Sequence, residues 1–179
     1  MNKWQLLKST PVLSTPWLSV LKNQYRVSEG EVIDDYYIVS RNDFVLVVAL
    51  KGGKLILVRQ YRPATDRFYL ALPAGFLQPD ESPELGAQRE LLEETGFSAT
   101  EHRLIGELHP LPGYIRSAAF VVLCEVSSNN TGVFDQLEID DVIEVEWEDV
   151  VQMIIRGEIN EMQAVSAILL AREVLGGCH

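Results

Sequence analysis

Short apolar runs separated by polar turns recur along the chain and predict strands. Gly30 marks the turn of an N-terminal strand pair. Gly52-Gly53 signals a second hairpin, because glycine adopts the backbone angles that tight turns need. The last run alternates apolar with acidic residues, as expected of a strand with one face in water. The predicted strands are Trp17–Leu21, Tyr36–Val39, Phe44–Leu50, Lys54–Tyr61, Leu104–Leu108, Ala118–Val126 and Val142–Trp147.

Three segments carry the signals of helices. Ser82 followed by Pro83 begins the first, since a hydroxyl caps free backbone N–H groups and proline fits the first helical position. Gly96 ends it, because glycine accepts the left-handed conformation of a helix stop. Its leucines Leu85, Leu91 and Leu92 are expected to share one side. Two later helices are predicted over Glu148–Ile155 and roughly Glu161–Leu175, on either side of Gly157.

Polar and proline-rich segments predict the loops. His109–Arg116 connects two predicted strands, and Ser127–Gly132 is rich in asparagine. The order of strands, helix, strands and helices predicts an α/β protein with a mixed sheet flanked by helices. No repeat or long linker divides the sequence, so residues 1–179 are expected to form a single domain.

The segment GFLQPDESPELGAQRELLEETGF, residues 75–97, contains the most informative motif. It follows the spacing G-x5-E-x7-R-E-U-x-E-E-x-G-U, in which U is aliphatic or aromatic. This pattern is the Nudix box. Its fixed positions are occupied by Gly75, Glu81, Arg89, Glu90, Glu93, Glu94 and Gly96. Because every one is filled, an ordinary solvated acidic helix is the weaker interpretation.

The glutamates of the motif suggest a cation site. On a helix, Glu90, Glu93 and Glu94 fall within an arc of about 100°. Glu90 and Glu94 repel each other one turn apart, which costs a bare helix roughly 0.2–0.5 kcal/mol. A cation would offset this repulsion, and carboxylate oxygens suit Mg²⁺ or Mn²⁺. Arg89 can reach Glu93 four residues on and orient its carboxylate.

Composition limits the other possibilities. The 179 residues are 47% hydrophobic, typical of a globular domain, and contain no apolar run long enough for a membrane span or a signal peptide. A formal charge of −11 argues against nonspecific binding to nucleic acid or anionic membranes. Cys124 and Cys178 have no metal-ligand spacing and no disulfide framework, so a reducing cytoplasm is expected.

The chain resembles Nudix hydrolases over nearly its whole length, through the motif and the order of its elements. The resemblance implies an α/β/α sandwich with a mixed sheet, preceded by an N-terminal β-hairpin. It also implies hydrolysis of a nucleoside diphosphate linked to another moiety, with Mg²⁺ or Mn²⁺ as cofactor. Glu90, Glu94 and the Ala74 backbone carbonyl would hold the metal, which would neutralise diphosphate oxygens and acidify a water.

Three features resemble the ADP-ribose pyrophosphatase-like subgroup. Pro112 lies sixteen residues after Gly96, and Val58–Arg62 and Gly157–Ile159 are similar to segments of that subgroup. The resemblance favours ADP-ribose or a nucleotide sugar as substrate. It further implies a homodimer formed through residues 1–42, in which Trp17 to Arg41 contribute to the partner's substrate pocket. Two positions depart from the subgroup, with Ala71 and Ser117 where many members carry glutamate.

Candidate roles follow from charge and from the resemblance. The base that accepts the proton of the attacking water is expected at Glu138, with Asp141 second and Glu93 as the fallback. Arg62 and Arg116 are the expected phosphate contacts, because they supply positive charge in an acidic chain. An aromatic residue such as Tyr36, Tyr37 or Tyr114 could stack on the base of the nucleotide, although strand aromatics more often belong to a core. The remaining predicted substrate-binding residues are Pro112 and Gly113.

Two alternatives remain open from the sequence. The same chemistry could act on a dinucleoside polyphosphate or a modified nucleotide. A nucleotide-sensing module without catalysis is the other alternative, but such a module would be expected to lose glutamates of the motif, and none is lost.

Overall fold

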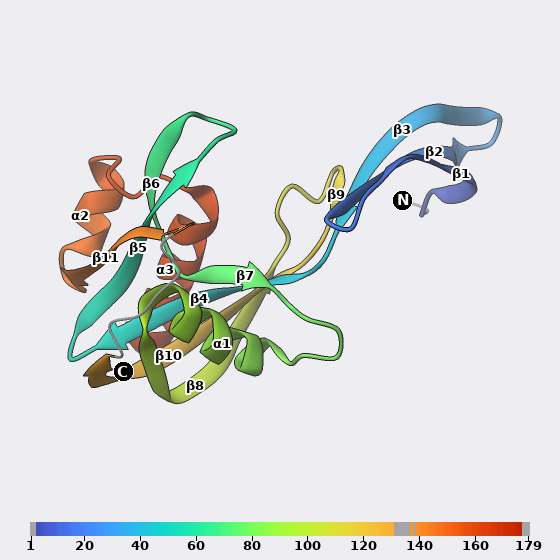
Figure 1. Ribbon diagram of the computed structural model, residues 1–179. Helices are drawn as coiled ribbons and strands as arrows, with labels where there is room; N and C mark the ends of the chain where they lie inside the picture. The colour runs from blue at the N-terminus through green and yellow to red at the C-terminus, as the bar shows by residue number, and fades with distance from the viewer. Residues whose placement is uncertain (1–2, 131–136, 138, 177–179) are drawn as a thin grey trace. The chain divides into compact units, whose positions relative to one another are not determined.

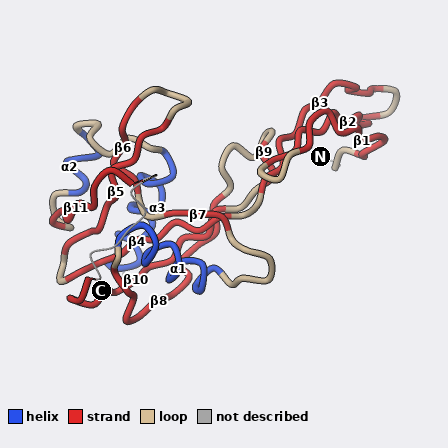
Figure 2. The backbone as a smooth tube through the Cα atoms, in the orientation of Figure 1, coloured by secondary structure: helices blue, strands red, loops and turns tan. Residues whose placement is uncertain are grey.

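The computed structural model describes residues 3–130, 137 and 139–176. The chain divides into two compact units, which we call the N-terminal unit, residues 1–43 with 109–118, and the main unit, residues 44–108 with 119–179. Strands dominate the N-terminal unit, whereas the main unit combines strands with the helices (Figure 2). The single-domain organisation of residues 1–179 stays a prediction.

The main unit is built on a mixed sheet of seven strands (Figure 1). Its main path runs β11-β5-β4-β10-β8; β6 pairs with β5, and β7 pairs with β4. Strands β4 and β10 are parallel, and the other pairs are antiparallel. The bounds are β4 Phe44–Lys51, β5 Lys54–Arg62, β6 Arg67–Ala71, β7 Ala74–Phe76, β8 Phe97–Leu108, β10 Ala119–Asn130 and β11 Ile139–Glu146.

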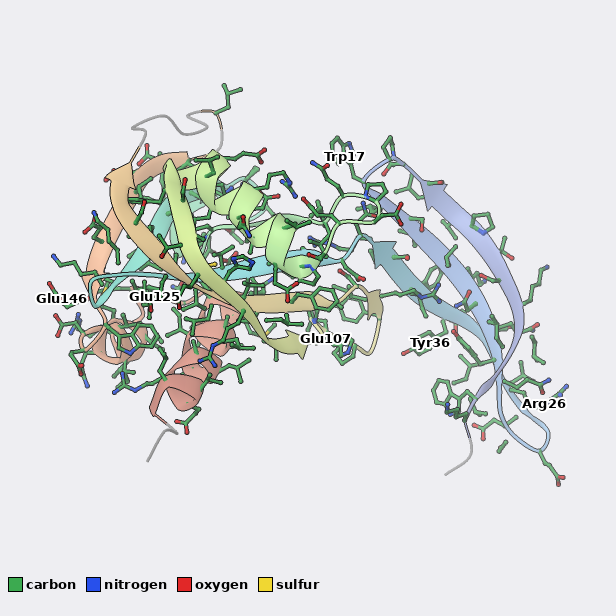
Figure 3. The ribbon with its side chains drawn as sticks, turned by 90° about the horizontal axis from the view of Figure 1, so that it is seen from below. Trp17, Arg26, Tyr36, Glu107, Glu125 and Glu146 are labelled. Atoms are coloured by element: carbon green, nitrogen blue, oxygen red, sulfur yellow. The ribbon has the colours of Figure 1, made fainter. Side chains whose placement is uncertain are left out.

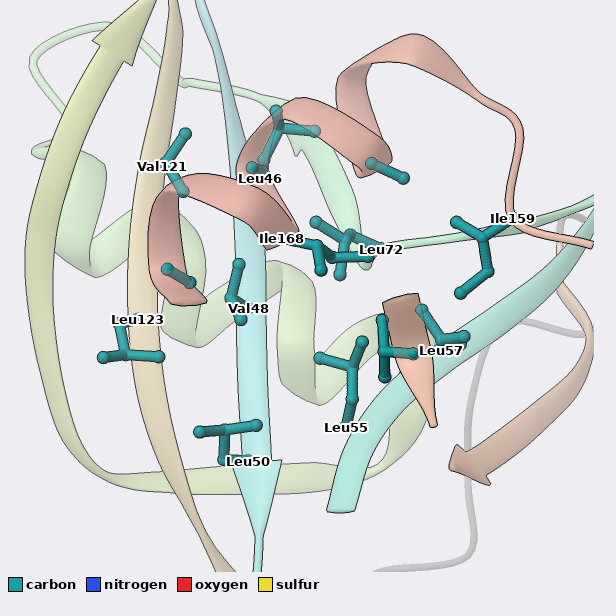
Figure 4. Close-up of a cluster of buried hydrophobic side chains, with 14 of the residues drawn as sticks. Leu46, Val48, Leu50, Leu55, Leu57, Leu72, Val121, Leu123, Ile159 and Ile168 are labelled. Atoms are coloured by element: carbon teal, nitrogen blue, oxygen red, sulfur yellow. The ribbon is translucent and has the colours of Figure 1, made fainter. Parts of the chain in front are cut away.

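Helices cover both faces of this sheet, because β4 sends successive side chains to opposite sides. On one face, Leu46 and Val48 belong to an apolar cluster with residues of helix α3, Met162–Gly176 (Figure 4). The same cluster contains Val150 of helix α2, Val150–Ile155. On the other face, residues of β4 pack with Ala87 and Leu91 of helix α1, Pro83–Thr95. This arrangement confirms the predicted α/β/α sandwich.

The N-terminal unit is a second, four-stranded sheet in the order β1-β2-β3-β9. Its strands are β1 Gln5–Ser14, β2 Leu18–Ser28, β3 Glu31–Arg41 and β9 Ile115–Arg116. The antiparallel β2–β3 pair, which turns at Gly30, confirms the predicted hairpin. Strand β1 was not predicted from the sequence. All ten of its residues are exposed, so no buried face requires apolar and polar residues to alternate.

Other predicted elements agree with the structure, with two corrections. The hairpin at Gly52-Gly53, the strand that becomes β11 and the helices α1, α2 and α3 are all present. The prediction of a loop over Ser127–Gly132 is wrong for residues 127–130. These residues extend β10, in which Asn130 pairs with Phe97 of β8. The predicted loop over His109–Arg116 is wrong at its end, because Ile115–Arg116 form β9 and pair with β3. Within the described residues, no helix is long and apolar enough to cross a membrane.

Candidate functional site

Helix α1 has well-defined ends, as its sequence predicts. The Ser82 hydroxyl accepts a hydrogen bond from the Leu85 amide at 3.3 Å. At the other end Gly96 is left-handed, with φ 73°, and its N–H donates to the Leu92 carbonyl. These caps fix the length of the helix and therefore the height at which each glutamate lies along it.

The buried face of α1 carries carboxylates. Glu90 and Glu94 are only 9% and 8% exposed, and they share that face with Ala87 and Leu91. The expectation that three leucines share one side is wrong for Leu85 and Leu92. These two are 58% and 42% exposed, because they point away from the centre of the buried face. Buried carboxylates need compensating charge or hydrogen bonds, so this face of α1 is built for more than packing.

Arg89 gathers the acidic side chains. Its guanidinium donates to both oxygens of Glu81, from Nε to Oε1 and from Nη2 to Oε2, each at 2.9 Å. Nη1 lies 2.6 Å from Oε1 of Glu90 and 3.2 Å from Oε2 of Glu93, and Nη2 donates to the Phe76 carbonyl. The predicted contact with Glu93 is present. The stronger, two-point bond to Glu81 holds the guanidinium in one orientation.

Strand β7 brings backbone up against the two buried glutamates. The Ala74 N–H donates to Oε2 of Glu94 at 3.1 Å. A Cβ atom on Gly75 would lie 1.9 Å from Oε1 of Glu90, so only glycine leaves room for that carboxylate. Glycine at the first position of the motif therefore lets the Glu90 carboxylate pack directly on β7.

The charges of this cluster shift its titration. Hydrogen bonding by Arg89 is the largest cause that holds the pKa of Glu81 below its ordinary value. Burial raises the pKa of Glu90, and the neighbouring Arg89 opposes that shift only in part. The same carboxylates raise the pKa of the Arg89 guanidinium. One guanidinium thus faces three carboxylates. Its positive charge does not fully offset the cost of burying the Glu90 carboxylate, so a further cation would be favourable there.

This donor set fits a hard divalent cation. Glu90 and Glu94 are one helical turn apart on the buried face, and the Ala74 backbone lies beside Glu94. The pocket that Gly75 leaves for Glu90 would be filled by any larger residue. In the described part of the chain, no three acidic, histidine or cysteine side chains converge into a complete cage. Mg²⁺ commonly uses one or two carboxylates and completes its shell with waters and substrate phosphates.

Comparison with known proteins identifies the family of this chain. The model of the NUDIX domain matches residues 40–170. The chain is 34% identical over 160 residues to the ADP-ribose pyrophosphatase of Bacillus subtilis (strain 168), an alignment that covers 80% of this chain and 86% of the relative. The chain belongs to the NUDIX domain family. The matched residues include the whole motif and helix α1.

Two further Nudix proteins support the assignment. The ADP compounds hydrolase NudE of Escherichia coli (strain K12) is 29% identical over 140 residues, covering 77% of this chain and 74% of the relative. A crystal structure of an ADP compounds hydrolase superposes with a TM-score of 0.82 at 26% identity, covering 99% of this chain and 96% of the other. These findings confirm the predicted family, the fold and a hydrolase of nucleoside diphosphate derivatives.

The two arginines expected to contact phosphate lie in different units. Arg62 ends β5 in the main unit, where its Nη2 is 3.4 Å from Oε1 of Glu161. Arg116 is exposed in β9 of the N-terminal unit. A substrate phosphate would therefore compete with Glu161 for Arg62. Their roles in binding stay predictions.

The loop expected to recognise substrate belongs to the N-terminal unit, although it follows β8 in sequence. The Tyr36 hydroxyl donates to the Gly113 carbonyl, and the Val39 N–H donates to the Tyr114 carbonyl at 2.8 Å. Tyr36 also packs edge-on against the rings of Trp4 and Tyr25, and it is only partly buried. A second set, Pro112, Tyr114 and Tyr37, is exposed.

The acidic stretch expected to hold the base, residues 138–141, is described only in part. Glu138 lies outside the described residues. Asp141 is exposed in β11, and its Oδ1 accepts a hydrogen bond from the Val142 amide at 2.9 Å. Glu93, the fallback base, is exposed at the edge of the Arg89 network.

The two departures from the subgroup have structural roles. Ala71 is buried with Val58 and Ile139 in a small apolar cluster. Ser117 is buried, and its hydroxyl donates to the Asn42 carbonyl at 2.7 Å. Neither position leaves a carboxylate for the substrate. Cys124 is buried, and burial raises the pKa of its thiol to about 12, whereas Cys178 lies outside the described residues.

Two residues of the site were given no role from the sequence. Glu81 is the main partner of Arg89, and its fixed place in the motif was the available signal. Arg59, next to the acidic stretch, was noted only as part of Val58–Arg62. It pairs with Asp140 and lies over the ring of Phe68 at 4.0 Å, contacts across three strands that sequence spacing does not reveal.

Proposed function

We propose that this chain hydrolyses the diphosphate bond of ADP-ribose or of a nucleotide sugar, with Mg²⁺ or Mn²⁺. The observation that carries the proposal is the pair of buried carboxylates, Glu90 and Glu94, held against β7 by Arg89 and Ala74. The names of the relatives support the ADP-linked class of substrate.

In this proposal, residues of α1 and β7 together bind the metal. Glu90 and Glu94 present hard oxygen ligands, and the Ala74 carbonyl is the third. A bound divalent cation would neutralise diphosphate oxygens and acidify the attacking water. Arg89 keeps Glu90 and Glu93 in fixed rotamers, which lowers the cost of ordering them when the substrate arrives.

Proton transfer is assigned to the acidic stretch that leads into β11. Glu138 is the first choice as base and Asp141 the second, with Glu93 as the fallback. The choice can be made by comparing kcat for Glu138→Gln, Asp141→Asn and Glu93→Gln. The true base should lose about 10²- to 10⁴-fold, the usual contribution of general base catalysis, without weakened metal binding.

Substrate contacts and assembly complete the proposal. Arg62 and Arg116 bind phosphate oxygens, and Pro112, Gly113 and Tyr114 contact the rest of the substrate. The exposed apolar side chains of the N-terminal unit support a homodimer. We place the enzyme in the cytoplasm because its two cysteines suggest no disulfide framework.

A substrate panel tests the proposal. Purified protein is incubated with ADP-ribose, several nucleotide sugars, NADH and dinucleoside polyphosphates, and the products are separated and identified. Hydrolysis of ADP-ribose or a nucleotide sugar that requires Mg²⁺ or Mn²⁺ and stops with EDTA is expected. Preference for a dinucleoside polyphosphate would replace the proposed substrate, and inactivity with every diphosphate would overturn the proposed function.

A further inference from the structure

The entrance to strand β11 contains a β-bulge. Ile139 pairs with Gln60 of β5 and Asp141 pairs with Arg59, so Asp140 is an extra residue without a pairing partner. Strand β11 is at the edge of the main sheet. Bulges at sheet edges redirect side chains, and they recur beside active sites.

Packing explains why the extra residue is there. Ile139 and Val142 are three residues apart, and in a regular strand their side chains would point to opposite faces. Here both contact the same apolar cluster, in which Val58 and Ala71 are buried. The bulge at Asp140 shifts the alternation of side chains by one residue, so the side chains of Ile139 and Val142 both reach this cluster.

Arg59 holds the extra residue in place. Its guanidinium forms an ion pair with the Asp140 carboxylate and lies over the ring of Phe68 on β6, 4.0 Å from the centroid. Both members of the pair are exposed by more than a third, so the pair itself contributes little to global stability. Its effect is local, because one side chain connects β5, β6 and the bulge of β11.

We propose that Arg59 is a positioning residue for hydrolysis, which fixes Asp140 and Asp141 at the start of β11. This rests on the proposed function, in which a carboxylate of that acidic stretch acts as the base. Asp141 directly follows the bulge and is paired with Arg59 itself. Loss of the Arg59–Asp140 contact should therefore reduce turnover while substrate and metal binding are retained.

The same pair of strands supplies a matched control. At its far end, Lys54 Nζ lies 3.1 Å from Oε1 of Glu146, and this pair is as exposed as the first (Glu146 is labelled in Figure 3). Lys54→Met removes a β5–β11 ion pair without touching the bulge. Arg59→Met keeps an apolar stem against Phe68 and removes only the charge and the hydrogen bonds.

Steady-state kinetics with the substrate that gives the highest wild-type activity test the proposal. Arg59→Met should lower kcat by about 10- to 100-fold, the cost of misplacing a group by about 1 Å, with KM within about threefold. Arg59→Lys should restore kcat to within about threefold of wild type. Asp140→Asn should match Arg59→Met, and the double variant should lose no more than either single one, because both remove one contact.

Hydrogen exchange provides a readout that does not depend on activity. Amides of residues 139–142 should exchange faster in Arg59→Met than in wild type and stay unchanged in Lys54→Met. An equal loss of kcat in Lys54→Met, an unchanged kcat in Arg59→Met, or a much larger loss in Asp140→Asn alone would each overturn the positioning role. A wild type inactive on every diphosphate would instead overturn the proposed function, and the exchange data would still report whether Arg59 holds the bulge.

Discussion

Strand β4 buries seven of its eight residues, whereas strand β1 exposes all ten. Both units depart from the usual pattern of apolar side chains inside and charged ones outside: the main unit buries charged side chains, and the N-terminal unit exposes apolar ones. The main unit has a complete apolar core and still buries the charged Glu90 and Glu94. In the N-terminal unit, Asn23 is the only buried residue among residues 3–43, and Trp17 is 74% exposed.

Each reversal indicates a ligand of matching chemistry. A buried carboxylate costs stability unless a cation or hydrogen bonds compensate it, so the main unit is organised to receive positive charge. Exposed tryptophan, leucine and valine on a thin sheet cost little in a monomer but supply the contacts of an interface. If the main unit binds a metal and the N-terminal unit binds a partner, as proposed, substitutions in the two units should have different effects, the largest in the main unit.

The largest effect is expected when one buried carboxylate loses its charge. Glu94→Gln keeps the size of the side chain and removes a predicted metal ligand, so kcat should fall roughly 10³-fold at saturating Mg²⁺. Glu84→Gln in the first turn of the same helix is the control and should stay near wild type. Near-normal turnover of Glu94→Gln would remove the metal site from α1.

Removal of the shared guanidinium should mainly affect stability. Arg89→Met leaves Glu81 and Glu90 without their cation in a mostly buried cluster, which should cost the metal-free protein about 3 kcal/mol in urea unfolding. Arg156→Met, which breaks the exposed pair with Glu158, should cost less than about 1 kcal/mol. Equal losses in the two variants would mean that burial adds nothing to the Arg89 network.

The same variant has an expected pH dependence. Because Arg89 lowers the pKa of Glu81 in the folded state, their contribution to stability is present above the unfolded pKa and is lost as pH falls through the folded one. The stability gap between wild type and Arg89→Met should therefore narrow in acid. Urea melts at pH 7 and at about pH 3 measure the change, and a gap that widened in acid would contradict this origin of the shift.

Steric displacement of one ligand should have an intermediate effect. In Gly75→Ala the new methyl group would occupy the position of the Glu90 carboxylate, which must rotate away. We expect kcat to fall about 10²-fold, with a smaller effect on unfolding because the displaced atoms end a flexible side chain. Gly176→Ala, where a Cβ would meet nothing within 4 Å, is the control. A Gly75→Ala enzyme with full activity would show that Glu90 acts from another rotamer.

The sequence predicted most of the main unit, because its elements carry local signals. Ser82 and Gly96 define the ends of α1, and Gly52-Gly53 defines the β4–β5 hairpin. The direction of α1 was less clear. Its leucines were expected to share one side, whereas the face that packs on the sheet combines Leu91 and small residues with Glu90 and Glu94.

Long-range contacts were not predictable in this way. The parallel pairing of β9 with β3 joins Val39 to Ile115, far apart in sequence, and His109–Ala118 belong to the N-terminal unit. The bulge at Asp140 is equally hidden, because one extra residue in a strand leaves its composition unchanged. Such features depend on which strands become neighbours, and local patterns of apolar residues do not encode that.

The smallest effect is expected at the proposed dimer interface. Trp17 lies in the turn between β1 and β2 (Figure 3), and the backbone of that turn is held by Thr15, whose hydroxyl accepts hydrogen bonds from the amides of Trp17 and Leu18. Trp17→Ala should therefore leave the fold intact. Exposed tryptophans often supply a disproportionate share of binding energy, so the variant should raise the dimer dissociation constant by about 10-fold or more.

Sedimentation velocity across a concentration series measures this shift. Leu85→Ala removes an exposed leucine from α1 in the main unit and should leave the dissociation constant unchanged. If both variants dissociate alike, the interface is not specific to the N-terminal unit. If wild type remains a monomer at micromolar concentration, the exposed sheet does not form a homodimer, and its apolar residues must be explained by another partner. A shift confined to Trp17→Ala would support the assignment of cation binding to one unit and partner binding to the other.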